Sequence, residues 1–274
     1  MQIAEMSIGK GDDAVEASLL YLIDRPESVR CESSRDDATG WPGRSAPRIV
    51  TIANARALGE LSLDREGFRS VRHQTAVANF YDPEEVRRVY YPELTRLLSE
   101  VTGASKVVIF AHDVRSSDES KQDGDRVREP VSSVHNDYTP KSAPQMVRET
   151  LPDDEARHRL AKRFMEVNIW KPIRGPVLVR PLAVCDARSI APGDLIATDR
   201  YLKHEVYMMT FNPAHRWSYF PNMLAGETIL IKGFDSMVDG RARFTAHAAF
   251  VDPETPLGAP PRESIEARAL LFFE

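Results

Sequence analysis

The sequence lacks several features that would assign it to a large class of proteins. It has no apolar run near the roughly 18 residues that a membrane-spanning helix needs, and the opening stretch MQIAEMSIGKGDD does not resemble a signal peptide. Lys and Arg number 36 against 41 Asp and Glu, and the net charge of −5 argues against a nucleic-acid or anionic-membrane binder. Because there is no G-x-S-x-G turn and no internal repeat, a serine hydrolase and a repeat protein are also disfavoured.

Cysteine is scarce as well. Cys31 and Cys185 stand alone, without the spacing of a metal site, and nothing requires a disulfide between them. This usage favours a reducing compartment, and we expect a cytoplasmic protein. The length of 274 residues and the 42% apolar content are typical of a soluble globular chain, which we expect to form one domain over 1–274.

The first part of the chain mixes strand-like runs with polar stretches. The second half of 14–23, the run 49–58 and the alternating run 67–77 are typical of strands or buried turns, and 106–115 predicts a short buried strand. The stretch 27–48 is polar with Gly and Pro, so it predicts a loop.

Two segments have helical patterns. Residues 82–103 begin with Asp-Pro, carry acidic residues in the first turn and end at Gly103. Their apolar positions recur at steps of three and four: Val86, Val89, Tyr90, Leu94, Leu97, Leu98 and Val101. A second, charge-rich helical pattern covers about 143–165 and is interrupted at Leu151-Pro152.

The second half of the chain is rich in short β-type runs separated by Gly, Pro, Asn and Asp. There are seven of these runs: 167–173, 176–187, 204–211, 215–221, 227–236, 241–250 and 264–273. Such spacing predicts an antiparallel sandwich or barrel. We therefore expect a mainly β fold with flanking helices, a jelly roll whose core covers about 105–274, while 1–65 is less defined.

The sequence VSSVHNDYTP places His135 and Asp137 two residues apart, which puts an imidazole and a carboxylate on one side of a strand end. His247, in a later β run, could complete the set. Two histidines and one carboxylate on one face of a metal, with other positions open, are typical of non-haem Fe(II) oxygenases. The spacing alone is a weak signal, and it gains weight from the β-rich context.

His215 is the alternative to His247 as third ligand, or else a substrate-binding or core residue in an aromatic-rich stretch. Order along the chain favours His247. His112 is followed by Asp113, but successive strand residues face opposite sides, so this pair does not suit one ion. The remaining histidines fit structural or solvated positions: His73, His158 and His204.

An oxygenase that uses 2-oxoglutarate needs a cation for the distal carboxylate of that co-substrate. Arg262 and Arg268 follow His247 by 15 and 21 residues, on or just before the last strand. The planar guanidinium suits a carboxylate because it donates two parallel hydrogen bonds. The sequence leaves open which of the two binds 2-oxoglutarate, and also whether either simply pairs with Glu263 or Glu266.

Other residues are candidates for the co-substrate or substrate pocket. An amide and a guanidinium stand near an indole in VNIWKPIRGP, where Asn168 is a candidate for the co-substrate and Trp170 and Arg174 for an organic substrate. The alternative is a core Trp beside a Pro-rich turn. Tyr138 directly follows the H-x-D motif and is expected to line the pocket.

Taken together, the strings NIWKPIRGPVLVRPLAVCDARS, HRWSYFPNM, ETILIKGFDS and HAAFVDP…APPRESIEARAL resemble the hydroxylase/desaturase family typified by gibberellin desaturase, and they are similar to a protein of cephalosporin 7α-methoxylation. The resemblance extends from about Ser70 to the C-terminus. It implies a double-stranded β-helix, Fe(II) held by His135, Asp137 and His247, and 2-oxoglutarate and O2 as co-substrates. Where the family often has H-T-A-F, this chain has His247 followed by Ala-Ala-Phe.

Two hypotheses of function follow. The first is an Fe(II)/2-oxoglutarate-dependent dioxygenase, a hydroxylase, desaturase or related C–H oxidase acting on a small secondary-metabolite-like molecule. The second is a jelly-roll accessory or binding protein of a biosynthetic pathway with a non-catalytic metal site. In both cases we expect a small-molecule partner, no nucleic acid, no membrane and a homodimer as a plausible assembly.

Overall fold

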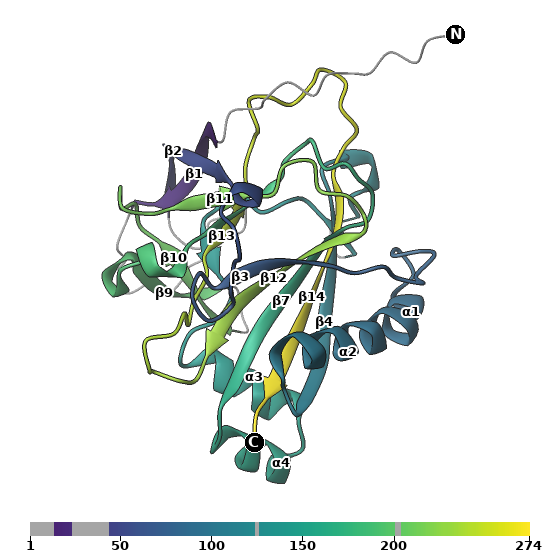
Figure 1. The fold of residues 1–274 in the computed structure, drawn as a ribbon, viewed down its shortest axis with the longest axis vertical. Helices are drawn as coiled ribbons and strands as arrows, with labels where there is room; N and C mark the ends of the chain where they lie inside the picture. Colours follow the sequence, from purple (N-terminus) through teal and green to yellow (C-terminus); the bar gives the residue numbers. More distant parts are fainter. Residues whose placement is uncertain (1–13, 24–43, 124–125, 201–203) are drawn as a thin grey trace.

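The fold consists of two curled β-sheets that face each other, with helices on the outside (Figure 1). The computed structural model describes residues 14–23, 44–123, 126–200 and 204–274. Sheet A contains eight strands, in spatial order β1 (Ala14–Leu22), β2 (Ser45–Asn54), β11 (Trp217–Tyr219), β8 (Leu182–Cys185), β13 (His247–Ala249), β6 (His135–Asn136), β10 (His204–Met209) and β9 (Leu195–Arg200). Sheet B contains six: β3 (Phe68–Arg72), β12 (Glu227–Asp235), β7 (Phe164–Pro172), β14 (Glu263–Phe272), β4 (Lys106–Ser116) and β5 (Val127–Arg128).

Neighbouring strands are antiparallel except for the pairs β2–β11 and β4–β5. Strands far apart in the sequence become neighbours, because β13 lies between β8 and β6 while β14 lies between β7 and β4. An apolar cluster fills the space between the sheets at one end, with Trp170 from β7, Val184 from β8 and Ile231 from β12. The expectation of a mainly β jelly roll with flanking helices is confirmed.

Period-two alternation gives sheet B an apolar outer face, while the middle of its inner face carries polar side chains between two apolar clusters. On β7, Val167 and Ile169 point outward into an apolar cluster, and on β14 Ala267 and Ala269 do the same. The residues between them are polar and face sheet A, which is the arrangement that strand geometry requires. The outer face is therefore a helix-binding surface, and the inner face is available for chemistry.

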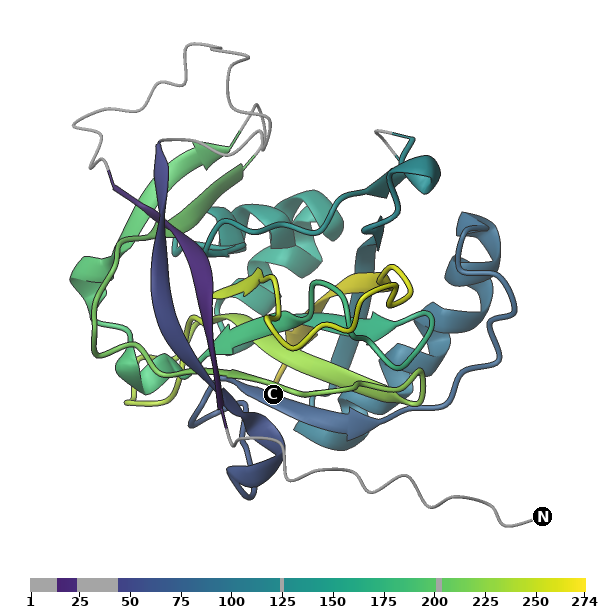
Figure 2. The same cartoon turned by 90° about the horizontal axis from the view of Figure 1, so that it is seen from above.

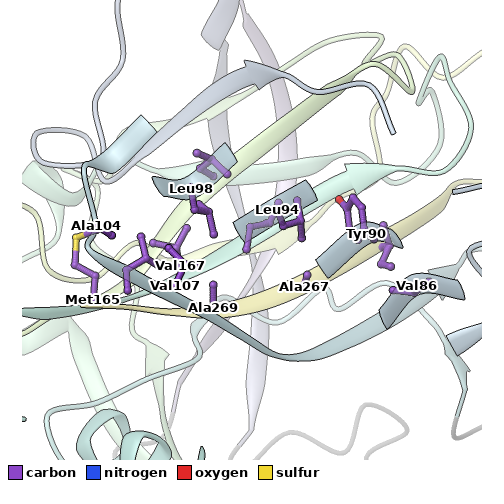
Figure 3. Close-up of a cluster of buried hydrophobic side chains, with 14 of the residues drawn as sticks. Val86, Tyr90, Leu94, Leu98, Ala104, Val107, Met165, Val167, Ala267 and Ala269 are labelled. Carbon is purple, nitrogen blue, oxygen red and sulfur yellow. The ribbon is translucent and has the colours of Figure 1, made fainter. Parts of the chain in front are cut away.

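A helical segment covers this outer face (Figure 3). It comprises α1 (Pro83–Glu85), a π-helical stretch η2 (Val86–Tyr90) and α2 (Tyr91–Thr102). Asp82 caps its start by accepting from the backbone N–H of Glu84, and Gly103 ends it with a φ of 71°. Leu94 and Leu98 are fully buried against the sheet. The helix predicted over 82–103 is present, and the π-helical stretch was not foreseen.

Two shorter helices close the end of the sandwich opposite the Trp170 cluster. α3 (Ser142–Thr150) and α4 (Asp153–Leu160) are separated at Leu151-Pro152, where the helical pattern was interrupted. The helix predicted to about residue 165 is wrong at its end, because β7 begins at Phe164. They pack with the ends of β7, β12 and β14 in an apolar cluster that contains Val147, Phe164 and Phe234. The remaining single turns are η1 (Ala55–Ala57), η3 (Glu119–Lys121), η4 (Ala187–Ser189) and η5 (Pro192–Asp194).

The first two strands, β1 and β2, belong to sheet A. Figure 2 shows β1 and β2 running side by side along one flank of the sandwich, and β2 joins the sheet through β11. The predicted loop 27–48 is wrong at its end, because Ser45–Arg48 begin β2; residues 27–43 lie outside the described residues, as does Cys31. The β-branched pair at Ile49 and Val50 continues a strand that the Pro and Gly upstream concealed.

The seven β-type runs each contain a strand, although some strands are shorter than the runs. β13 has three residues. The strand-like run predicted over 67–77 in the first part of the chain is likewise only partly a strand, since β3 ends at Arg72. β9, with the sequence LIATDR, was not predicted because it lacks clear alternation. No helix within the described ranges has the length and apolar character needed to cross a bilayer.

Candidate metal centre

His135, Asp137 and His247 come together on the inner face of sheet A. His135 is in β6 and is directly paired with His247 of β13, and Asp137 directly follows the last residue of β6. Each offers one potential ligand atom, and these atoms lie within 4.8 Å of one another. The two imidazole rings have centroids 4.4 Å apart, and all three residues are buried. The pairing of two short strands thus assembles a group that the sequence separates by more than a hundred residues.

Both imidazoles are oriented through their Nδ1 atoms. Nδ1 of His135 lies 2.7 Å from the carbonyl oxygen of Ser133, and Nδ1 of His247 lies 3.4 Å from that of Thr245. A carbonyl oxygen only accepts, so Nδ1 carries the proton and Nε2 keeps a lone pair. Nε2 of His135 lies 3.6 Å from Oδ1 of Asp137. Histidines held in this way are prepared to bind a metal through Nε2.

The second oxygen of Asp137 is held by sheet B. Oδ2 accepts from Nδ2 of Asn168 at 2.8 Å and lies 3.3 Å from Nε of Arg268. The other two nitrogens of Arg268 donate to Asp113 at 2.8 Å and to Glu266 at 3.0 Å. All three guanidinium nitrogens of Arg268 therefore contact carboxylates. Burial lowers the pKa of Arg268, but the three carboxylates outweigh it and raise the pKa above the usual value.

Arg262 has different surroundings, although it lies only six residues earlier. It is 3% exposed and sits over the ring of Trp170, with 5.4 Å from Cζ to the ring centroid. Nη1 donates to the carbonyl of Arg180, Nε has no hydrogen-bond partner, and Arg262 forms no ion pair with any described residue. Burial, followed by the nearby Arg115 and Arg180, lowers its pKa to about 9. A buried guanidinium without a counter-anion is suited to bind an anion.

A cavity connects this arginine with the two histidines. It is lined by Arg115, Val131, His135, Trp170, Leu182, His247, Ala249, Arg262 and Glu266. Its lining thus includes two imidazoles and two guanidinium groups. A dicarboxylic keto acid needs these two features, one to chelate a metal and the other to bind a distal carboxylate.

A larger cavity, of about 440 Å³, is lined by Arg188, Tyr207 and Phe244 among others, and its lining includes none of His135, Asp137 and His247. Met208 of β10 is paired with His135 and shares its face, whereas the adjacent Tyr207 points the other way and lines the larger cavity. Cavity size therefore does not identify the metal centre.

Glu166 is a further inward-facing carboxyl group, on β7 two residues before Asn168. It is fully buried, and neither carboxyl oxygen has a hydrogen-bond partner among the described residues. Burial, with the negative Asp137 nearby, raises the pKa of Glu166 well above its usual value. This environment therefore favours the neutral form of the Glu166 carboxyl group.

Other residues predicted for the site lie in varied surroundings. Trp170 lines the cavity. Tyr138 is buried and packs against Gly233, where a Cβ would lie 2.7 Å from Cδ2 of its ring. The side chain of Arg174 is 76% exposed and lies 3.5 Å from Glu263. Their roles toward a substrate stay predictions.

His215 is engaged elsewhere in sheet A. Its Nδ1 lies 3.1 Å from the hydroxyl of Tyr21, its Nε2 lies 3.1 Å from Asp194, and its ring stacks on that of Tyr21. It is not part of the His–Asp–His group. His112 contacts Tyr91 while its neighbour Asp113 contacts Arg268, so the two point in opposite directions as expected from strand alternation.

The sequence interpretation did not assign roles to Asp113, Arg115, Glu166 and Glu266. Glu266 was considered only as an ion-pair partner for the arginines, and that contact with Arg268 is present. The available signal was polar residues at every second position of an otherwise apolar run, as in MEVNIW. Polar side chains at buried strand positions have either a functional role or a hydrogen-bond or ion-pair partner.

The family model described as Oxidoreductase/YMDC permease-like domain matches residues 19–272. Among curated proteins, the chain is 37% identical over 243 residues to hydroxylase/desaturase efuI of Hormonema carpetanum, covering 79% of this chain and 80% of the relative. It is 35% identical over 280 residues to the Fe(II)/2-oxoglutarate-dependent dioxygenase nvfI of Aspergillus novofumigatus, covering 94% and 96%.

The comparison with solved structures agrees with the similarity to these curated proteins. The structure described as iron and alpha-ketoglutarate-dependent endoperoxidase NvfI with different conformation superposes with a TM-score of 0.85 at 30% identity. The superposition covers 96% of this chain and 99% of the other. The likeness therefore extends over nearly the whole chain.

Proposed function

This chain belongs to the Oxidoreductase/YMDC permease-like family and is a non-haem Fe(II)/2-oxoglutarate-dependent oxygenase, and on this premise we propose that His135, Asp137 and His247 hold its iron. The observation that carries the assignment is the buried group of three ligand atoms within 4.8 Å. Its donor set, two imidazoles and one carboxylate, is the set that Fe(II) oxygenases use, and it leaves other metal positions open. The residues present therefore fit the metal.

We assign the distal carboxylate of 2-oxoglutarate to Arg262. Arg262 shares a cavity with both histidines and has no anionic partner among the described residues. Arg268 is already committed to Asp113, Asp137 and Glu266, so a further carboxylate would have to displace one of them. Arg115 lines the same cavity and adds to its positive charge. Asn168, a candidate for the co-substrate, contacts Asp137 instead.

Bound iron with 2-oxoglutarate and O2 supplies the oxidation of a C–H bond, with succinate and CO2 as co-products. The chain's own residues orient the participants. The two Nδ1–carbonyl contacts fix the imidazoles, Trp170 covers the guanidinium of Arg262, and the buried walls of the cavity keep water away from the metal.

The substrate is a small secondary-metabolite-like molecule in this proposal. The support comes from relatives named hydroxylase/desaturase and endoperoxidase, and from a relative named aspirochlorine biosynthesis protein N, 38% identical over 141 residues. These relatives favour a catalytic enzyme over an accessory protein. Cytoplasmic location, homodimerisation and the absence of nucleic-acid and membrane partners stay predictions, and the buried, unpaired Cys185 is compatible with the first.

Substitution at the ligands tests the assignment. His135→Ala, Asp137→Ala and His247→Ala should each lose Fe(II), measured anaerobically by equilibrium dialysis and metal analysis, because each removes one of three ligands. His215→Ala is the control and should keep the metal, since its partners are Tyr21 and Asp194. Loss of iron in His215→Ala, with retention in His247→Ala, would overturn the assignment of the third ligand.

A further inference from the structure

The two oxygens of Asp137 have different surroundings. Oδ1 faces Nε2 of His135 at 3.6 Å, on the side where the ligand atoms gather. Oδ2 faces sheet B, where it accepts from Nδ2 of Asn168 at 2.8 Å and lies 3.3 Å from Nε of Arg268. Two donors thus converge on the oxygen that is turned away from the histidines.

The position of these donors is built into the register of sheet B. Asn168 of β7 and Arg268 of β14 are directly paired, so both side chains stand on the same face and point toward sheet A. Figure 1 shows β7 and β14 as neighbouring central strands of sheet B. The contact therefore joins the two sheets at the carboxylate.

Arg268 is itself held in place. Its partners Glu266 and Asp113 are directly paired across β14 and β4, an arrangement of like charges that would be unfavourable alone. Arg268 donates to both and so offsets the repulsion. Asn168 Nδ2 also lies 3.3 Å from Glu266, which completes a connected set of polar contacts. The side chains of Asn168 and Arg268, which donate to Oδ2 of Asp137, are thus held in place by this network of contacts.

We propose that Asn168 and Arg268 are positioning residues that hold Oδ2 of Asp137, so that the carboxylate binds iron through Oδ1 alone. The inference rests on the proposed function, because it concerns the same metal. Its chemical reason is the number of open positions. A second carboxylate oxygen on the metal would take a position that the keto acid or O2 needs.

The test uses Mn(II) as a metal probe and needs no turnover. Asn168→Leu keeps the approximate shape of the side chain and removes the donor, and it should weaken Mn(II) binding about 10- to 100-fold, measured by electron paramagnetic resonance titration. Asn168→Ser retains a donor and should recover part of the affinity. For the guanidinium, Arg268→Met should weaken binding and Arg268→Lys should recover part of it.

A second readout separates positioning from general structural damage. In the anaerobic Fe(II)·2-oxoglutarate complex, the visible charge-transfer band should shift in Asn168→Leu, because the carboxylate donor set at the metal changes. Ser264→Ala, on the same strand as Arg268, buried and without a partner for its hydroxyl among the described residues, is the matched control and should change neither readout. Thermal unfolding of each apo-variant establishes that it is folded.

The outcomes are distinguishable. Wild-type protein that binds no Mn(II) would contradict the proposed function itself. Wild-type binding together with unchanged affinity and an unchanged band in Asn168→Leu would overturn the positioning role while leaving the function intact. If an Arg268 variant does not fold, the Asn168 variants decide, and Asn168→Ala replaces Asn168→Leu should the latter be unstable.

Discussion

At the scale of single residues, Arg262, just before β14, and Arg268, within β14, show how different surroundings give two arginines different properties. Arg262 is buried, Arg268 is half-buried with 14% of its side chain exposed, and both face the interior of the sandwich. Arg268 is surrounded by carboxylates, which raise its pKa, whereas burial and neighbouring cations lower the pKa of Arg262 to about 9. Of these two arginines, Arg262 is therefore the one whose charge a bound anion stabilises more.

Arg262→Gln should raise the dissociation constant of 2-oxoglutarate by about 30-fold or more, since losing one partner of a buried charge pair costs about 2–5 kcal/mol. Metal binding should be retained because Arg262 does not contact the ligands. The measurement is an anaerobic titration of the Fe(II) protein with 2-oxoglutarate.

Arg188→Gln is the control for this prediction. Arg188 pairs with Asp186, its side chain is 49% exposed, and it lines the larger cavity instead. Its 2-oxoglutarate affinity should equal that of wild type. An unchanged affinity in Arg262→Gln would contradict the assignment of the co-substrate arginine.

The three grouped residues and both arginines could be selected from the sequence, because H-x-D spacing and chain order are local signals. The partners of Arg268 could not. That Glu266 faces Asp113, and Asn168 faces Arg268, depends on the registers of three strands, one of which shifts between Arg268 and Ala269. The pairing register of a strand depends on its partner strands across the sheet, so the sequence of a single strand does not determine it.

At the scale of elements, β7 serves two purposes because its side chains alternate between the two faces of sheet B. Its outward residues pack under α2, and its inward residues Glu166, Asn168 and Trp170 face the metal centre and its cavity. Glu166 is the unusual member, since a buried carboxyl group without a partner destabilises the fold when it ionises.

Glu166 therefore gives a pH-dependent prediction. The pKa of Glu166 is raised in the folded state. Between the unfolded-state pKa and the folded-state pKa, the unfolded chain therefore binds fewer protons than the folded chain does. The contribution of Glu166 to the free energy of unfolding falls as pH rises through this range. Glu166→Gln stays neutral and should raise the Tm of the apo-protein at about pH 8, with little effect at about pH 4.5 and below.

Glu155→Gln provides a control of opposite sign. A hydrogen bond from Lys106 lowers the pKa of Glu155, so its stabilising contribution is present at neutral pH and is lost as pH falls. This variant should lower the Tm slightly at about pH 8, because the pair is partly exposed. Equal pH profiles for Glu166→Gln and wild type would show that Glu166 ionises without cost.

Elements that have a signal in their own sequence could be predicted. Elements that form only because neighbouring strands pair with them could not. The helix over 82–103 follows from its capping residues and its periodicity. β13, with three residues, and β6, with two, exist because neighbouring strands pair with them. These short strands nevertheless carry the metal ligands, so the most important elements had the weakest sequence signals.

At the scale of the whole molecule, the centre lies at the junction of two sheets. The three candidate ligands lie on or directly after strands of sheet A, while sheet B supplies Asn168 and Arg268, and Arg262 lies directly before β14. The N-terminal hairpin of β1 and β2 extends sheet A and buries Tyr21 against His215 and Trp217. This explains why the aromatic stretch around His215 serves packing in the described structure.

The most direct test of the account is an anaerobic titration of the apo-protein with Fe(II) and 2-oxoglutarate, followed by visible absorption. We predict a weak charge-transfer band that requires both components and is absent in Asp137→Ala. Such a band demonstrates metal, co-substrate and open coordination positions in a single experiment. A folded wild-type protein that gives no band and leaves iron unbound would contradict the central claim that this chain is an Fe(II)/2-oxoglutarate-dependent oxygenase.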